Sequence, residues 1–146
     1  MTRSTPPRRA RLWHLPRLAR ILWAANPRHS RRARLDDLRA LARLVLRGQI
    51  THVPGRLGPN GFLARDGARI HALYTHPRAR RQGIGAHLLR DAQRQSPKLE
   101  LWTAQENHPA RKLYAAHGFF PVALSNGRGN DEGQPDMRLI WQRNAP

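Results

Sequence analysis

The sequence contains no cysteine, and only two of its 27 basic residues are lysines. Without cysteine the chain has no disulfide, no thiolate metal site and no thiol nucleophile, a composition that is typical of cytoplasmic proteins. No apolar run approaches the ~20 residues that a membrane-spanning helix needs. Acidic residues are also scarce, at nine in 146. These absences predict a soluble, cytoplasmic chain of single-domain size, with no membrane span.

The scarcity of acids leaves a formal net charge of +18, almost all of it from arginine. One explanation is a polyanionic partner such as nucleic acid, because phosphate neutralisation supplies most non-specific affinity. The other explanation is a GC-rich genome, which favours arginine over lysine. Composition alone does not decide between the two.

The charge is concentrated at the start of the chain, where residues 1–35 hold ten arginines and no acid. Leucines recur there at helical spacing, at positions 12, 15, 18 and 22, and Asn26-Pro27 ends the pattern. We expect a helix of the domain, preceded by a disordered tip from Met1 to Arg9. A transit peptide or a membrane-surface helix is the alternative. The change in composition predicts a basic arm over residues 1–34 and a folded domain over residues 35–146.

Apolar periodicity and turn residues predict alternating helices and strands in the rest of the chain. Asp66-Gly67 marks a hairpin turn, and Asn107 and Gly118 are suitable first and last residues around a helix. The expected helices cover residues 35–47, 84–95 and 108–117, and the expected strands cover residues 50–53, 61–65, 68–75, 99–103, 119–124 and 137–141.

The segment HPRARRQGIGAHLL, residues 76–89, joins a predicted strand to a predicted helix. Backbone N–H groups of such a loop converge at the positive end of the helix dipole, which is an anion site. Gly83 and Gly85 would let a phosphate approach the main chain, and Arg80 and Arg81 add positive charge. The glycines could instead serve only to permit a turn. A dinucleotide fingerprint and a P-loop are both excluded, because Leu88 replaces the third glycine and no Gly-Lys-Ser/Thr is present.

With its flanks, this segment reads LYTHPRARRQGIGAHLL and resembles the acyl-CoA-binding motif of the GNAT acetyltransferase superfamily, bacterial type. A second segment, LELWTAQENHPARKLYAAHGFFPV, is similar to the motif that follows it in the family. Asn107, Tyr114 and Gly118 occupy its characteristic positions. The hairpin GFLARDGARIHALY and the tail GNDEGQPDMRLIW also resemble family members, so the likeness extends from about Ile50 to Trp141.

The resemblance implies an α/β fold with a mixed, mostly antiparallel twisted sheet, flanked by helices, in which two adjacent parallel strands part in a V. It implies that acetyl-CoA is the cosubstrate, with its pyrophosphate on the loop amides and its pantetheine arm paired like a strand. The cofactor-binding residues that it implies are Leu73, Tyr74, Thr75, Arg80, Arg81, Gln82, Gly83, Ile84, Gly85, Ala86, Asn107 and Arg111.

For catalysis, the resemblance implies that Tyr114 is the general acid, because a phenol can protonate a leaving thiolate of similar basicity. Tyr114 could instead be only a packed core residue. The base is less evident, since the strand before the loop carries His71 where many family members carry a carboxylate. His71 can accept a proton near neutral pH, and Glu106 or a water chain are alternatives. The remaining histidines have no metal-ligand spacing, so we expect no metal.

The first fifty residues depart from the family pattern, because no clear first strand precedes Pro16. That region shapes the acceptor pocket in the family, so the sequence leaves the amine unidentified, whether small molecule or protein. The net charge favours an acidic acceptor over polyamines or basic peptides. A catalytically silent, basic binding module for nucleic acid or the ribosome is the rival to an active N-acetyltransferase. Homodimers are common in the family, so the resemblance leaves a homodimer as one alternative, and the sequence itself does not determine the oligomeric state.

Overall fold

The computed structural model describes residues 5–26, 30–129 and 133–144. Contacts divide the chain into two compact units, residues 1–65 with 72–88 and residues 66–71 with 89–146. We describe each unit by itself. The boundary expected at residue 34 stays a prediction.

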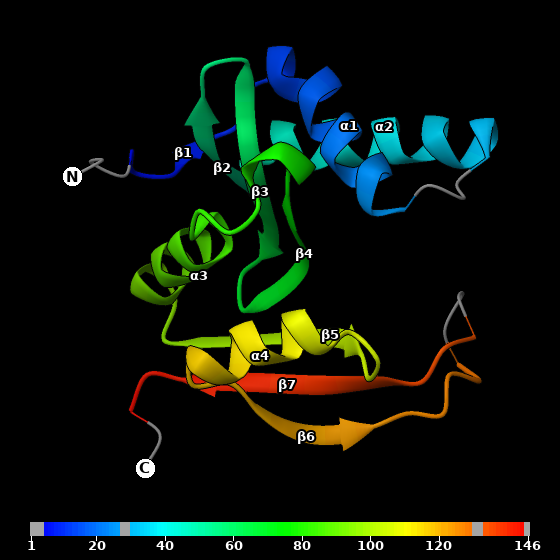
Figure 1. Cartoon of the computed structure of the whole chain (residues 1–146), viewed down its shortest axis with the longest axis vertical. Coiled ribbons are helices and arrows are strands. Elements are labelled where there is room, and N and C mark those ends of the chain that lie inside the picture. The colour runs from blue at the N-terminus through cyan, green and yellow to red at the C-terminus, as the bar shows by residue number, and fades with distance from the viewer. Residues whose placement is uncertain (1–4, 27–29, 130–132, 145–146) are drawn as a thin grey trace. The chain divides into compact units, whose positions relative to one another are not determined.

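Within these described residues, the strands join into one sheet in the order β1-β2-β3-β4-β5-β7-β6, and four α-helices accompany it (Figure 1). The pairings of β2 with β3, β5 with β7 and β6 with β7 are antiparallel. This confirms the α/β class with a mixed, mostly antiparallel sheet. The strands are β1 (Arg8–Arg9), β2 (Ile50–Gly55), β3 (Gly58–Asp66), β4 (Arg69–Thr75), β5 (Lys98–Ala104), β6 (Phe120–Leu124) and β7 (Asp136–Gln142). The helices are α1 (Leu15–Ala25), α2 (Arg31–Leu46), α3 (Ile84–Gln95) and α4 (His108–Ala116).

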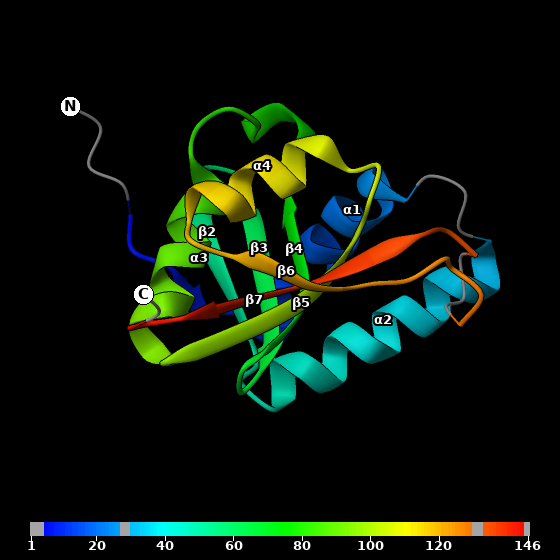
Figure 2. The same ribbon diagram turned by 90° about the horizontal axis from the view of Figure 1, so that it is seen from below.

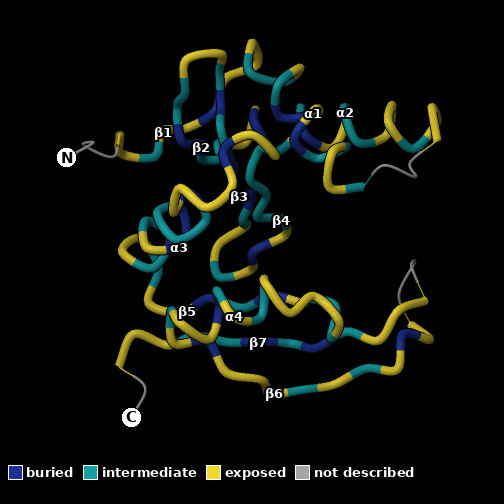
Figure 3. Tube along the Cα trace, viewed as in Figure 1, coloured by how far each residue is buried: buried dark blue, intermediate teal, exposed yellow. Residues whose placement is uncertain are grey.

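The core of the first unit lies between the β2–β3 strands and the two N-terminal helices, and β3 is its most buried strand (Figure 3). Leu18 and Ile21 of α1 are fully buried there with Phe62 of β3. Trp23 Nε1 of α1 donates a hydrogen bond of 3.1 Å to Asp37 of α2. Helix α1 is therefore a core element, as expected, and its apolar face is not free to enter a membrane.

The second unit is built on β7, which pairs with β5 on one side and β6 on the other (Figure 2). The β5–β7 register runs without interruption from Lys98↔Gln142 to Ala104↔Asp136. Alternate residues of these strands, among them Leu99, Leu101 and Leu139, are buried, as the period of two for a half-buried strand requires.

A parallel pairing between β4 and β5 is found at Arg69↔Glu100, where the Glu100 amide donates a 2.8 Å hydrogen bond to the Ala68 carbonyl. The Glu100 carboxylate accepts a hydrogen bond from Arg138 of β7, and this contact lowers the pKa of Glu100. The V-shaped parting of β4 and β5 stays a prediction.

Two expectations near the N-terminus were wrong. Arg8 and Arg9 are not part of a disordered tip, because they pair with His52 and Thr51 as a short first strand; Met1 to Ser4 lie outside the described residues. Helix α2 starts at Arg31 rather than at residue 35. The cause is Ser30, whose hydroxyl accepts a 3.1 Å hydrogen bond from the Ala33 amide and caps the helix.

Within the part of the chain that the structure describes, no helix is both long and apolar enough to cross a bilayer.

Candidate active site

The loop between β4 and α3 is fixed at its start by His76. The His76 amide donates a 2.7 Å hydrogen bond to the Asn60 carbonyl near the start of β3. The Nδ1 atom of His76 accepts a 3.1 Å hydrogen bond from the Arg78 amide. Burial, with the charges of Arg17 and Arg78, lowers the pKa of His76 and so favours the neutral ring, which can accept this bond. A 3-10 turn follows at Pro77–Ala79 and buries Ala79.

The loop then takes an unusual backbone course. Arg81 has φ of +65° and Gly83 has φ of +74°, both in the left-handed region. Left-handed residues that alternate with others turn successive N–H groups toward one concavity, which is how backbone nests bind anions. Gly83 has open space where a Cβ would lie, so its backbone angle, rather than crowding, is what requires glycine. Arg80, Arg81 and Gln82 are exposed beside it.

The loop leads directly into the N-terminus of α3. Ile84 is buried and anchors the helix, and Gly85 and Ala86 follow in the first turn. The first N–H groups of a helix have no acceptor within it and carry the positive end of the dipole. The amides expected to bind pyrophosphate are thus gathered at one helix start, next to exposed arginine side chains.

Gly61 of β3 is a part of this arrangement that the sequence did not reveal. A Cβ at Gly61 would lie 2.6 Å from Ile84 Cγ2 and 3.0 Å from the Tyr74 carbonyl oxygen. The first distance is far below van der Waals contact and the second is tighter than most, so only glycine lets Ile84, at the start of α3, pack this close to β3. A glycine within a predicted strand is a weak signal of close backbone approach, and it was the only signal available.

Residues Leu73, Tyr74 and Thr75, which the family likeness assigns to the pantetheine arm, form the last part of β4 and are half-buried. The Tyr74 ring packs against Phe62, with 5.8 Å between ring centroids. His71 lies earlier on the same strand, in the second unit, with an exposed side chain.

Asn107 begins α4 in the second unit, as the sequence predicts. Its Oδ1 accepts a 3.3 Å hydrogen bond from the Ala110 amide, which leaves the side-chain NH₂ group of Asn107 outside the cap. Arg111, one turn later, donates a 2.9 Å hydrogen bond from Nη1 to the Gln105 carbonyl. Gln105 in turn donates to the Ser125 and Asp136 carbonyls, so the turn before α4 is tied to both neighbouring strands.

Tyr114 lies at the end of α4 and is only 7% exposed. Its ring centroid is 5.6 Å from that of Phe119, and its carbonyl accepts hydrogen bonds from the His117 and Phe119 amides. Helix α4 thus presents Asn107, Arg111 and Tyr114 within one unit, whereas the glycine loop belongs to the other unit. Among the described residues, no cluster of three or more His, Cys, Asp or Glu side chains could hold a metal.

Comparison with known proteins agrees with this description. Residues 13–119 match the model of the acetyltransferase (GNAT) family. Because that match spans most of the sequence, the chain belongs to this family.

Among curated proteins, the chain is 38% identical over 83 residues to the peptidyl-lysine N-acetyltransferase YiaC of Escherichia coli (strain K12). The aligned segment is 56% of this chain and 55% of that protein, so the likeness spans about half the length of each.

Solved structures share the fold. A GNAT-family acetyltransferase from Bacillus cereus ATCC 10987 superposes with a TM-score of 0.79 and 19% identity, over 95% of this chain and 97% of that one. The PaiA N-acetyltransferase from Thermoplasma acidophilum, solved in complex with coenzyme A, superposes with a TM-score of 0.65 and 17% identity, over 93% of this chain and 97% of that one. At such identities the likeness concerns the fold.

Proposed function

We propose that the protein is an N-acetyltransferase that moves the acetyl group of acetyl-CoA to an amine. The observation that carries this proposal is the β4–α3 loop, with left-handed backbone at Arg81 and Gly83 leading into a helix N-terminus. Membership of the GNAT family supports it. The loop suits a diphosphate because its main-chain donors are already oriented before any ligand binds.

Acetyl-CoA supplies the acetyl thioester. The amides from Arg81 to Ala86 bind the diphosphate of acetyl-CoA. The positive charges of Arg80 and Arg111 attract its third phosphate, on the ribose. The main chain of Leu73 to Thr75 pairs with the amides of the pantetheine arm, and the free NH₂ group of Asn107 binds on its other side. Each assignment rests on the position of the residue in the family motif and on the polar groups described above.

Tyr114 is the general acid of the proposed reaction. The neutral amine forms a bond to the thioester carbonyl carbon, the carbon–sulfur bond breaks, and the Tyr114 hydroxyl gives its proton to the departing sulfur. The amine loses its proton to His71, directly or through water. Tyr114 is buried on α4, so its phenol keeps one orientation, which favours proton transfer over loss to solvent.

The acceptor that best satisfies the observations is a lysine side chain within an acidic protein segment. The relative named above acts on peptidyl-lysine, and the positive charge of this chain favours carboxylates beside the reacting amine. Polyamines and basic peptides are disfavoured by the same charge. The homodimer and the cytoplasmic location stay predictions.

The experiment that tests the function is thiol release from acetyl-CoA with a panel of amines. We expect release with a lysine peptide flanked by glutamates, and slower release with the same lysine flanked by arginines or with spermidine. Faster turnover of the basic peptide or spermidine would contradict the acceptor assignment alone. No release above the rate without enzyme, for any amine, would favour the silent binding module.

A further inference from the structure

The positive charge of the protein belongs almost wholly to one unit. Residues 1–65 and 72–88 contain 18 arginines and two aspartates, a formal charge of +16. Residues 66–71 and 89–146 contain nine basic and seven acidic residues, a formal charge of +2. A genomic preference for arginine would act on both units alike, so it does not explain why acids are missing from the first.

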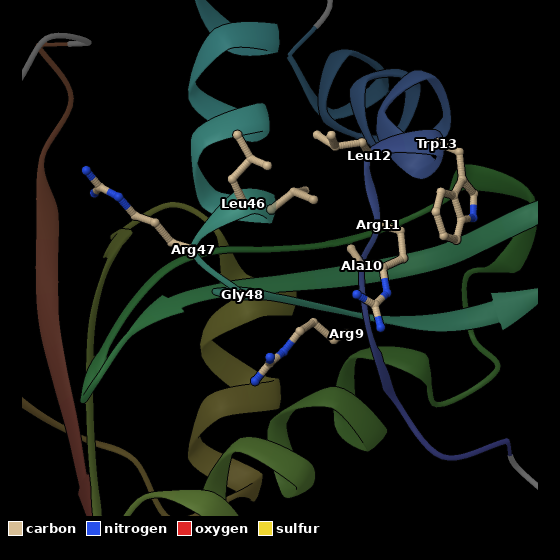
Figure 4. A pocket seen from close by; sticks show the side chains of 9 residues that line it. Arg9, Ala10, Arg11, Leu12, Trp13, Leu46, Arg47 and Gly48 are labelled. Atoms are coloured by element: carbon tan, nitrogen blue, oxygen red, sulfur yellow. The ribbon is translucent and has the colours of Figure 1, made fainter.

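Within the first unit, five of the arginines line two pockets that share an exposed tryptophan. Trp13 lies in a 3-10 turn at Leu12–His14 and is 76% exposed. On one side it lines a pocket of about 440 Å³ together with Arg9, Arg11 and Arg47, which come from β1, the residue before the 3-10 turn and the end of α2 (Figure 4). Leu12 and Leu46 form the apolar part of that pocket.

Trp13 also lines a second pocket, of about 690 Å³, which is lined by Arg17 and Arg20 of α1 as well. Pro59 of β3 forms part of its wall, and its carbonyl accepts a 3.0 Å hydrogen bond from Arg17 Nε. The exposed indole is therefore shared by two hollows, each of which carries arginine side chains.

The segment that carries Trp13 is held firmly to the sheet. The Ala10 amide donates to the Ile50 carbonyl at 2.9 Å, and the Arg11 amide donates to His14 Nδ1 at 2.9 Å. The His14 ring packs at a tilt against buried His52, with centroids 4.3 Å apart. The indole is thus presented on a fixed support, and little conformational entropy is lost when a ligand stacks on it.

We propose that this surface, defined by Trp13 with Arg9, Arg11, Arg17, Arg20 and Arg47, binds single-stranded RNA. Base–aromatic stacking and arginine contacts to phosphates are how single strands bind without sequence preference. The guanidinium group forms paired hydrogen bonds to phosphate oxygens, which lysine does not. A duplex is less suitable because its bases are already stacked and unavailable to Trp13.

A lipid surface is the other partner that arginines and exposed Leu and Trp side chains suggest. It is disfavoured here because the apolar face of α1, which would have to enter the lipid, is buried in the core through Leu18 and Ile21. The side chains that remain exposed are scattered around pockets rather than aligned on one helix face.

The test is fluorescence anisotropy with a labelled oligouridylate of about 12 nucleotides, a length within the range that single-strand binding surfaces cover. Trp13→Ala should weaken binding about tenfold, and Trp13→Phe should restore most of the affinity. The matched control is Trp102→Ala, which removes an exposed tryptophan of β5 in the nearly neutral unit and should leave the affinity unchanged.

Salt dependence tests the arginines. Log affinity should fall linearly with log salt between about 50 and 200 mM, and the double variant Arg9→Gln/Arg47→Gln should reduce that slope by about 1.4. Arg90→Gln, an exposed arginine of α3 in the other unit, should not reduce the slope. Thermal unfolding of each variant checks that its fold is intact.

Several results would overturn the proposal. The first is an RNA affinity of Trp13→Ala equal to that of the parent protein, and the second is tighter binding to double-stranded than to single-stranded RNA. The third is Trp13-dependent binding to vesicles of phosphatidylcholine and phosphatidylglycerol in equal parts, if that binding is tighter than binding to RNA. Thiol release with acetyl-CoA should be retained in all these variants, which separates this surface from the proposed active site.

Discussion

Gly61 of β3 and Ile84 of α3 lie so close that a Cβ on Gly61 would lie 2.6 Å from Ile84 Cγ2. The same Cβ would lie 3.0 Å from the Tyr74 carbonyl, on the strand proposed to pair with the pantetheine arm. One small residue thus determines how closely the start of α3 and the end of β4 approach β3. The proposed diphosphate site depends on that approach.

Gly61→Ala should therefore displace Ile84 and the loop amides. We expect the free energy of unfolding to fall by about 1–3 kcal/mol, as for other overpacked positions, and the affinity for coenzyme A to fall with it. Gly129→Ala is the control, since open space surrounds Gly129. Chemical denaturation and calorimetry measure the two effects, and unchanged coenzyme A affinity in Gly61→Ala would show that the approach is not needed.

Gly83→Ala tests the backbone angle rather than the packing. A residue other than glycine at φ of +74° costs about 1–2 kcal/mol, so the loop should turn its amides away and bind coenzyme A more weakly. Gly67→Ala is a matched control, because Gly67 has φ of +56° and open space but lies in the β3–β4 hairpin turn. The control should lose a similar free energy of unfolding and keep its affinity for coenzyme A. If both variants bind coenzyme A with equal affinity, the loop is not the anion site.

Tyr114→Phe should lower the turnover number for thiol release by about 100-fold, the usual contribution of a general acid. The dissociation constant for coenzyme A should not change, because the ring that packs against Phe119 remains. Phe119→Leu provides the comparison, as it weakens this packing without removing the hydroxyl. If Phe119→Leu and Tyr114→Phe reduce turnover alike, Tyr114 acts through packing and not as an acid.

Stability should depend on pH through His52. Burial, together with the charges of His14 and Arg8, lowers the pKa of His52 from 6.5 to about 4. Between pH 6.5 and 4 the His52 ring is therefore protonated in the unfolded chain but neutral in the folded chain. The free energy of unfolding is highest above pH 6.5 and decreases as the pH falls toward 4, by up to about 3 kcal/mol. Denaturation at several pH values should show this slope, and His52→Leu should flatten it; an unaltered slope in the variant would contradict the assignment.

The helices and most strands could be predicted because their signals are local. Asn107 caps α4 as expected, and Asp66-Gly67 connects β3 to β4, its neighbour in the sheet. The sequence predicts the start of α2 too late, because Asp36 and Asp37 favour a first turn near residue 35, whereas Ser30 provides the cap. Strand β1 has only two residues and is defined by its pairing with His52 and Thr51 of β2, so no local sequence pattern predicts it.

The residues assigned to the candidate site come from the family motif and stay predictions, and the sequence indicates little of their geometry. Two glycines allow a positive φ in this loop, but the structure has it at Gly83 and at Arg81, and residues with a Cβ rarely adopt that conformation. The role of Gly61 depends on a side chain 23 positions later in the chain, and no local pattern encodes such a contact. Likewise, nothing in the sequence places Trp13 beside both Arg47 and Arg20.

The most direct test of the proposed function is calorimetric titration of the intact protein with coenzyme A and with pantetheine, which lacks the diphosphate. If the loop amides bind the diphosphate, coenzyme A should bind with a micromolar dissociation constant and pantetheine should bind at least about 100-fold more weakly, the share expected of charge-assisted hydrogen bonds. Equal affinity for the two ligands, or no heat with coenzyme A at millimolar concentration, would contradict the account.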